Sequence, residues 1–435
     1  MKILNLHIDQ FRHLENLDFD FTYPEDFHID EKRGKPLDKI CFIGQSATGK
    51  TGLLETIFEN INYLFDLQTV NNKFILDRTK GLNPLNGELN LKLKNEYLKY
   101  DKETISFKGS EFIYKDGNGS VSKLVPQDYK DNLFYLKSNL ISDKNIELFS
   151  TNPIDLIEKY NSQIENIKIS TRNNKLKPLI ISFDDKVDVI TWLFLINEIL
   201  DYRKNFTQKM SELIHKGLIA NQKKLSAEFE KWQKDNPNIL ELFANKFNSA
   251  LEKLNLEVDV INTEYSIPIK NKRNDEVIPI QNTSTGTKGL LLSFLPLYSL
   301  DTKDSIILID EPERSLYPDM QMDLMEYYQN LAPDAQFIVA THSPFIAASF
   351  EPEERFILYF NKEGKVAVRR GSSPIGDDPN DMLKNDFGVN YYNKFGEEAY
   401  KKYLNLKQDL AKEKDPIKKK ELLLETVKLG DTYNF

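Results

Sequence analysis

The sequence predicts an α/β fold: a mixed sheet around a glycine-rich loop, an antiparallel β subdomain, a short helical arm inserted in the core, and a helical C-terminal tail. Three observations predict it. A short apolar strand runs into glycine and then into a helix at 40–65, and alternating apolar and polar residues follow at 87–125. A helical stretch at 187–254 then separates these elements from further apolar strands, so the core is split around the arm.

The domain boundaries are set where these patterns change. We expect an N-terminal lobe at 1–186, a helical arm at 187–255, a C-terminal lobe at 256–370 and a helical tail at 371–435. A chain of 435 residues is longer than one compact core usually contains. Its content of 40% hydrophobic and 29% charged residues is that of a folded globular protein.

Charge and cysteine content narrow the class of protein. The first residues alternate like a strand without a cationic apolar leader, and no apolar run approaches bilayer length, so we expect a cytoplasmic protein without a membrane partner. The single cysteine, Cys41, cannot form an internal disulfide. A formal net charge of -9 argues against a generally basic nucleic-acid-binding surface, although a local basic face is compatible with it.

The N-terminal lobe begins with strand patterns and then carries a helix. The strands are expected at 2–8, 17–23 and 40–43, and the helix at 51–65. The alternating stretches at 87–125 predict an antiparallel sheet that includes an Asp-Gly-Asn-Gly hairpin turn at 116–119.

The rest of the chain alternates between helix and strand patterns. The arm is interrupted at Pro237 and lacks the many heptads of a long coiled coil. Strands are expected at 179–183, 257–261, 265–269, 277–280, 305–309, 336–340 and 355–359.

Residues 44–51 form the most specific motif. Gly44-Gln45-Ser46-Ala47-Thr48-Gly49-Lys50-Thr51 fits the pattern G-x-x-x-x-G-K-[ST]. Its glycines let the loop curl so that amide protons face phosphate oxygens at a helix N-terminus. Lys50 would reach the β- and γ-phosphates of ATP, and Thr51 would ligate Mg²⁺.

An apolar strand at 305–309 ends in two acids. Carboxylates at the end of a buried strand are held rigidly beside the phosphates. Asp310 would hold Mg²⁺ through its water shell, and Glu311 would orient and deprotonate the attacking water. Taken alone, such a strand end is equally well an ordinary structural feature.

Two further motifs depend on their context. Ser284-Thr285-Gly286-Thr287-Lys288 precedes an apolar helix and can serve as an anion site or as an ordinary N-cap. His342 follows the strand at 336–340, where a histidine is either structural or a phosphate sensor.

The four motifs in this order resemble the ABC-type ATPase family over most of residues 1–370. The resemblance implies that Ser284, Gly286 and Lys288 meet the γ-phosphate bound by the opposite subunit, so hydrolysis would need a head-to-head dimer. His342 would sense the same phosphate in its own subunit. The run from Asp310 to Pro318 and the sequence Thr341-His342-Ser343-Pro344 resemble the RecF, SMC-like and OLD-type group. In that group an arginine such as Arg12 lies close to the nucleotide.

The sequence departs from this group at three places. Ser46 and Ala47 stand where relatives usually have Asn-Gly, and Tyr317 stands where a histidine is commoner. The glutamine of the family's Q-loop is not placed, with Gln127 and Gln163 as candidates.

Three functions are compatible with these motifs. The tail resembles the end of stand-alone ATPases of anti-phage systems, such as Septu-type and PARIS-type subunits. The alternative interpretation of the tail is a pair of amphipathic helices that cap the core or serve as a docking surface. We therefore expect an ATPase that controls a separate nuclease or toxin, since too few residues follow His342 for a Toprim nuclease. The alternative is a RecF/SMC-like DNA-repair or DNA-maintenance ATPase, with DNA as a candidate partner. A transporter engine fits the arm and the acidic run less well.

Overall fold

The structure is a computed structural model that describes residues 1–65, 86–101, 104–113, 125–129, 131–173, 179–389, 394–433 and 435. The chain divides into two compact units, unit 1 over Met1–Gly376 and unit 2 over Asp377–Phe435. This division falls shortly after residue 371, where the tail is predicted to begin. The predicted hairpin turn at 116–119 lies outside the described residues.

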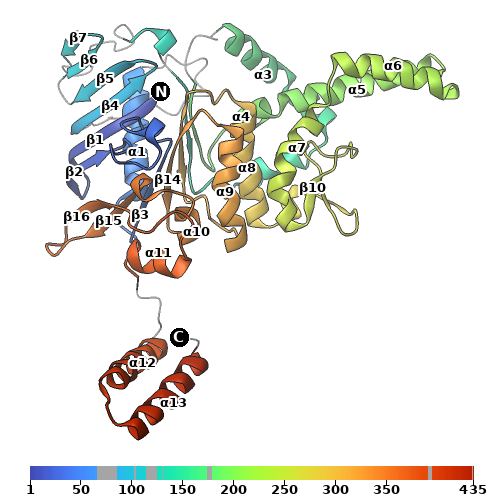
Figure 1. The fold of residues 1–435 in the computed structure, drawn as a ribbon. Helices are drawn as coiled ribbons and strands as arrows, with labels where there is room; N and C mark the ends of the chain where they lie inside the picture. Colours follow the sequence, from blue (N-terminus) through green and yellow to red (C-terminus); the bar gives the residue numbers. More distant parts are fainter. Residues whose placement is uncertain are drawn as a thin grey trace. The chain divides into compact units, whose positions relative to one another are not determined.

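Unit 1 is built on a seven-stranded sheet in the order β16-β15-β3-β14-β13-β8-β9 (Figure 1). All neighbouring strands pair in parallel except β16, which runs antiparallel to β15. A mixed sheet of this kind confirms the predicted α/β class. The strands are β3 (Lys39–Gly44), β8 (Leu133–Leu136), β9 (Ile180–Phe183), β13 (Ile306–Asp310), β14 (Gln336–Thr341), β15 (Arg355–Phe360) and β16 (Val366–Arg370).

An antiparallel sheet forms the second layer of unit 1, in the order β2-β1-β4-β5-β6-β7. Alternating burial along β4 shows why its sequence alternates, since only one face meets the core. Its strands are β1 (Lys2–Phe11), β2 (Leu14–Asp20), β4 (Gly87–Leu93), β5 (Glu96–Asp101), β6 (Thr104–Phe107) and β7 (Ser110–Ile113).

Helix α1 (Lys50–Phe65) joins the two sheets through one apolar core. Its buried residues Leu53, Ile57 and Ile61 belong to the same cluster as Leu91 of β4 and Leu308 of β13. Burying each such side chain contributes about 1.5–3 kcal/mol. Because the phosphate-loop motif leads directly into α1, this core fixes the loop's helix against both layers.

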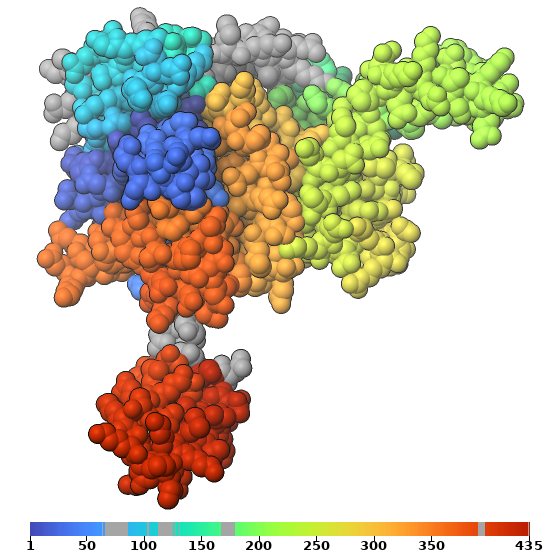
Figure 2. Space-filling model, in the orientation of Figure 1, coloured from blue at the N-terminus to red at the C-terminus, as the bar shows by residue number. Residues whose placement is uncertain are grey.

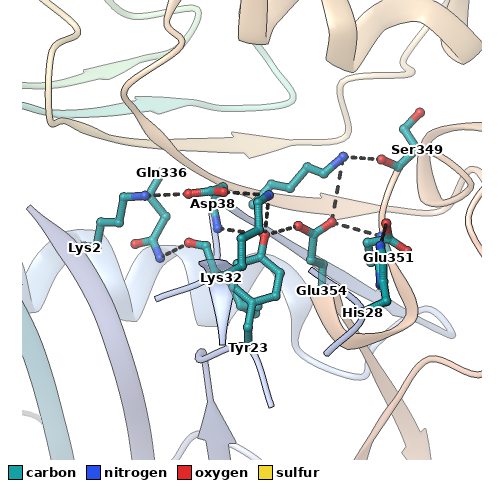
Figure 3. A network of polar contacts seen from close by, with 11 residues as sticks. Lys2, Tyr23, His28, Lys32, Asp38, Gln336, Ser349, Glu351 and Glu354 are labelled. Atoms are coloured by element: carbon teal, nitrogen blue, oxygen red, sulfur yellow. Dashed lines mark hydrogen bonds and ion pairs between the residues drawn. The ribbon is translucent and has the colours of Figure 1, made fainter. Parts of the chain in front are cut away.

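A polar network fixes β1 to the amino-terminal ends of the central parallel strands (Figure 3). The fully buried Gln336 side chain accepts from the Ile3 amide at 2.7 Å and donates to the Leu37 carbonyl at 2.8 Å. Tyr23 donates to the buried Glu354 carboxylate at 2.6 Å. Each of these buried groups would be costly to leave unpaired, so the network holds β1, the start of β3 and the turn before β15 in one register.

The predicted arm forms four helices, α4 (Val189–Leu195), α5 (Asn197–His215), α6 (Gln222–Asp235) and α7 (Ile239–Leu251). The break falls at Pro237 as expected, and Asn238 caps α7 by accepting from the Glu241 amide at 3.2 Å. Aromatic contacts of Tyr202 and Phe206 with Trp232 hold α5 against α6. These two helices project from the rest of unit 1 (Figures 1 and 2).

The remaining helices were only partly foreseen. In unit 1 they include α2 (Asp143–Phe149), α3 (Pro153–Asn173), α8 (Thr285–Ser299), α9 (Pro318–Leu331) and α10 (Pro344–Ala347), with a small sheet of β10 (Leu256–Val258), β11 (Ile269–Asn271) and β12 (Val277–Ile278). Unit 2 holds α11 (Pro379–Asn385), α12 (Lys394–Lys412) and α13 (Pro416–Tyr433). Within the described ranges, no helix has the length and apolar character needed to cross a membrane.

Candidate nucleotide-binding site

Adjacent parallel strands bring three of the predicted motifs to one edge of the sheet. β14 lies between β3 and β13, with Thr341 paired to Ile43 and Ala340 paired to Asp310. The phosphate loop, the acidic pair and His342 each follow the carboxyl end of one of these strands. Ligands of open α/β sheets bind at such an edge.

The loop between β3 and α1 has a backbone that requires its glycines. A Cβ at Gly44 would lie 2.3 Å from the Leu358 carbonyl oxygen, and Gly49 has φ of +93°. The Thr48 side chain is fully buried and donates to the Gln45 carbonyl at 2.8 Å. Gln45 and Ser46 are exposed at the bend. The loop is therefore held in its curled shape by the Thr48 hydrogen bond, and the residues at its bend face solvent.

Ala47 explains one departure from the family pattern. It has φ of +66°, in the left-handed region where a side chain is disfavoured and glycine is free of strain. A relative with Asn-Gly at 46–47 places glycine at this position, so the same loop conformation accounts for both sequences.

Lys50 lies across the inside of the loop. Its Nζ donates to the carbonyls of Gly44 at 2.9 Å and Gln45 at 3.1 Å, and the side chain is buried. Burial lowers its pKa to about 8, against the opposing effect of Glu311 and Asp310. An ammonium held among carbonyls at this point can exchange them for phosphate oxygens.

Thr51 and Asp310 form the candidate metal site. The Thr51 hydroxyl lies 3.1 Å from each carboxylate oxygen of Asp310. Burial raises the pKa of Asp310 to about 6, while hydrogen bonds from Thr51 and Ser138 lower it. A hydroxyl and one carboxylate fit Mg²⁺, which takes few protein ligands and keeps water or phosphate oxygens in its other positions.

Glu311 and His342 face each other beside this pair. The Glu311 Oε1 atom lies 3.9 Å from His342 Nε2, and both side chains are partly exposed. Glu311 has φ of +50° and donates its amide to the Ala340 carbonyl at 2.8 Å, which ties its strained backbone to β14. Burial and the nearby Lys50 lower the pKa of His342, so its imidazole is neutral at pH 7.

Glu313 is a site residue for which sequence reasoning assigned no role. Its carboxylate accepts from the Thr341 hydroxyl at 2.8 Å and from the His342 amide at 2.7 Å. Burial raises the pKa of Glu313, and these hydrogen bonds oppose that effect. Glu313 thus fixes the backbone from which the His342 side chain extends. The available signal was the acidic repeat Asp-Glu-Pro-Glu at 310–313.

The strand before Ser138 was also missed. β8 pairs in parallel with β13, and Ser138 follows its end on the side where Asp310 lies. Arg314 donates to the Ser138 carbonyl at 2.9 Å, which ties this turn to the acidic run. A run of four residues shows too few repeats of its period to be a reliable strand signal, although β9, of the same length, was predicted.

The Ser284 motif lies at the start of α8. Ser284 is exposed and accepts from the Thr287 amide at 3.1 Å, so in one copy of the chain it acts as an N-cap. Gly286 is required by a close approach, because a Cβ there would lie 2.5 Å from the Ser315 carbonyl oxygen. Lys288 is half-buried on the first turn of α8. The hydrogen bonds of Ser284 are with Thr287 and Lys288 of its own helix, not with residues of the phosphate loop.

Arg12 lies beside the first turn of α1. Its guanidinium is 2.9 Å from the Glu55 carboxylate, and a Cβ at Gly52 would lie 3.5 Å from Arg12 Nη1. Arg12 therefore lies against Gly52 and Glu55 of α1, and its side chain is 60% exposed.

Neither glutamine proposed for the Q-loop has a described side chain at this edge. Gln163 is exposed on α3, where its side chain contacts Ser162. Gln127 precedes β8, at the opposite end of that strand from the candidate site, and its side chain lies outside the described part of the chain.

Comparison with known proteins gives the following likenesses. Residues 1–347 match the model of a family described as AAA ATPase domain. A curated relative, the Retron Vc95 probable ATPase of Vibrio cholerae serotype O1 biovar El Tor, is 22% identical over 376 residues, which cover 78% of this chain and 73% of the relative.

Solved structures with some likeness include two SMC head domains. The head of Thermotoga maritima is 13% identical, covers 86% of this chain and 100% of its own, and has a TM-score of 0.39. The head of Pyrococcus furiosus, with an extended coiled coil and bound to the C-terminal domain of ScpA, is 14% identical, covers 85% and 96%, and has a TM-score of 0.38.

Proposed function

Because this chain belongs to the AAA ATPase domain family, we propose that it binds ATP with Mg²⁺ and hydrolyses it at a site completed by a second copy of the chain. The observation that carries the proposal is the meeting of the phosphate loop, Asp310, Glu311 and His342 at one sheet edge. Family membership supports nucleotide binding in general. The division of roles among the residues rests on their contacts.

The chain's own residues divide the chemistry among them. Residues 44–49 would cradle the phosphates, and Lys50 would bind the terminal ones. Thr51 and Asp310 would hold Mg²⁺, which supplies charge neutralisation between the phosphates. Glu311 would accept the proton of the attacking water, and His342, whose Nε2 lies 3.9 Å from the Glu311 carboxylate, would sense the γ-phosphate bound in its own subunit.

The exposure of Ser284 supports a composite site. A hydroxyl at a helix start is a good anion ligand, yet the Ser284 contacts lie within its own α8. A second copy that presents this turn to the phosphates would give Ser284, Gly286 and Lys288 their predicted role. The exposed face of the phosphate loop, at Gln45 and Ser46, leaves room for that approach.

The cellular role we propose is that of a sensor or regulatory ATPase in anti-phage defence, controlling a separate nuclease or toxin. Likeness to the Retron Vc95 probable ATPase, at 22% identity, supports it. The alternative is a RecF/SMC-like ATPase of DNA repair or maintenance. The neighbouring genes distinguish the defence role from the DNA-repair role. A small nuclease or toxin gene beside the gene of this chain favours defence, and replication or repair genes favour the alternative.

One pair of measurements tests the proposed function. Phosphate release should depend on Mg²⁺ and rise more than linearly with protein concentration, and solution mass should double when ATP is added to the Glu311→Gln variant. The same assay with double-stranded DNA tests the alternative, which expects DNA to stimulate hydrolysis. Turnover by a protein that stays monomeric with ATP would exclude the composite site.

A further inference from the structure

Helix α13 in unit 2 has two apolar faces. On the side toward α12, Leu422 and Leu429 are half-buried and Thr426 is buried. A second row, which we call the outer row, remains exposed at 73% for Ile417, 61% for Leu424, 51% for Val427 and 49% for Leu423. At 100° per residue the centres of the two faces are separated by nearly half a turn.

The outer row is unusual for a solvent-facing helix surface. A helix that is apolar on two sides is typical of one that packs between two neighbours, as in a helix bundle. Burying each of these side chains would contribute about 1.5–3 kcal/mol. A hairpin of two helices also has too little core to be stable by itself. Burial of the outer row against a further helical layer would add to this small core.

We propose that the outer row is covered by the α13 helix of a second copy, paired antiparallel about a twofold axis near Leu423 and Leu424. The two hairpins would form a four-helix bundle, and the same patch would serve on both copies.

Charge along α13 favours this occupant. At 100° per residue, Lys420 near its start and Asp431 near its end lie in line with the outer row, and Glu421 and Lys428 lie at the margins of that row. Glu425 faces α12 instead, where its carboxylate pairs with Lys402 at 3.0 Å. An antiparallel pair brings Lys420 of one copy near Asp431 of the other, and a parallel pair sets like charges together. A row flanked by both signs is complementary to itself.

This interface is separate from the proposed nucleotide site, because α13 lies in unit 2 and residues 44–51 and 284–288 lie in unit 1. It should form without ATP, so the ATP-dependent rise in solution mass and the concentration dependence of phosphate release expected of the nucleotide site are to be measured in the Leu424→Lys with Val427→Lys double variant, whose unit 2 dimer is weakened. The Lys50→Ala variant should keep it, and loss of the interface should leave ATP binding by each copy unchanged.

Disulfide trapping in the full chain without nucleotide tests the geometry. The Leu424→Cys variant lies at the axis and should form a covalent dimer on mild oxidation. The Asp431→Cys variant is its matched control, because antiparallel pairing separates its two copies by about 20 Å, from roughly 14 residues at 1.5 Å rise. Cys41 is buried and should not react. Equal trapping of both variants, or trapping of Asp431→Cys alone, would overturn the antiparallel pairing.

Solution mass tests the occupant. In the double variant Leu424→Lys with Val427→Lys the dimer dissociation constant should rise at least about tenfold. Ile219→Lys, at an equally exposed site on the arm, should leave it unchanged. A monomeric parent chain would overturn the proposal. Thiol labelling of Leu424→Cys would then show what covers the outer row. A protected thiol would mean that the same copy covers it, and a reactive thiol would mean that it faces solvent.

Discussion

The Thr51 hydroxyl lies 3.1 Å from both carboxylate oxygens of Asp310, although 259 positions separate the two residues. Thr51 begins α1 after β3, and Asp310 ends β13, with β14 between the two strands. Strand order alone therefore assembles the candidate metal site. This pair, with Lys50 and Glu311 beside it, gives the predictions that follow.

Lys50→Ala and Glu311→Gln should have different effects. Removing the ammonium from the loop should weaken ATP binding at least about a hundredfold, because a charged phosphate contact is lost. Glu311→Gln should bind ATP like the parent chain but hydrolyse it about 10²–10⁴-fold more slowly, because the general base is lost. Fluorescent-ATP titration and phosphate release separate the two effects, with the exposed Lys303→Ala as a control. Full turnover in Glu311→Gln would mean that another group is the base.

Ser284→Arg should leave ATP binding intact and block hydrolysis. Ser284 is exposed, so an arginine fits there at the cost of the N-cap bond to the Thr287 amide, about 0.5–2 kcal/mol, and its added bulk would obstruct the approach of a second copy. Steady-state ATPase rate and ATP affinity measure the two effects. The Ser299→Arg variant, exposed at the other end of α8, is the matched control. Normal turnover in Ser284→Arg would argue against a shared site.

Glu313→Ala should lower kcat about tenfold or more with little change in KM. The buried carboxylate holds the Thr341 hydroxyl and the His342 amide, so its loss frees the strand end that carries the imidazole. Unpaired buried donors should also cost about 1–3 kcal/mol of unfolding free energy. Kinetics and urea unfolding measure both, with the exposed Glu326→Ala on α9 as a control. Equal loss of activity in Glu313→Gln, which retains one acceptor, would point to a role of the charge itself.

Stability and metal binding should depend on the ionisation of Asp310. Burial raises its pKa from 3.8 to about 6 in the folded chain. A raised carboxyl pKa favours the folded state below the unfolded pKa, so this contribution is lost as pH rises from about 4 through about 6. Asp310→Asn should therefore be more stable than the parent by about 1–3 kcal/mol at pH 7 without nucleotide, and equal to it near pH 4.

Urea unfolding from pH 4 to pH 8 checks this, with the exposed Asp334→Asn as the control. Mg²⁺ affinity of the parent chain should fall about tenfold per pH unit below 6, because the metal needs the carboxylate. A stability difference that does not vary with pH would show that Asp310 is already ionised in the folded chain throughout this range.

Several elements of the fold could be predicted because their patterns are local. The phosphate loop has a fixed residue spacing, the strand at 305–309 is long and apolar, and Pro237 breaks the arm at the place foreseen. For strands of four or five residues the period is a weak signal, so β9 and β13 were predicted whereas β8 and β16 were missed. The roles of Glu313 and Ser138 could not be read because they depend on partners on other strands.

The sequence by itself determined the chemistry available to this protein: a loop that curls around phosphate, a strand that ends in two acids, and a helix start that carries a serine. Such features follow from backbone freedom and side-chain type at neighbouring positions. The tertiary structure decided which groups meet, since strand order sets Thr51 on Asp310 and Glu313 beneath His342. Packing within unit 1 also left the Ser284 turn exposed, and the contacts of α13 with α12 do not cover the outer row.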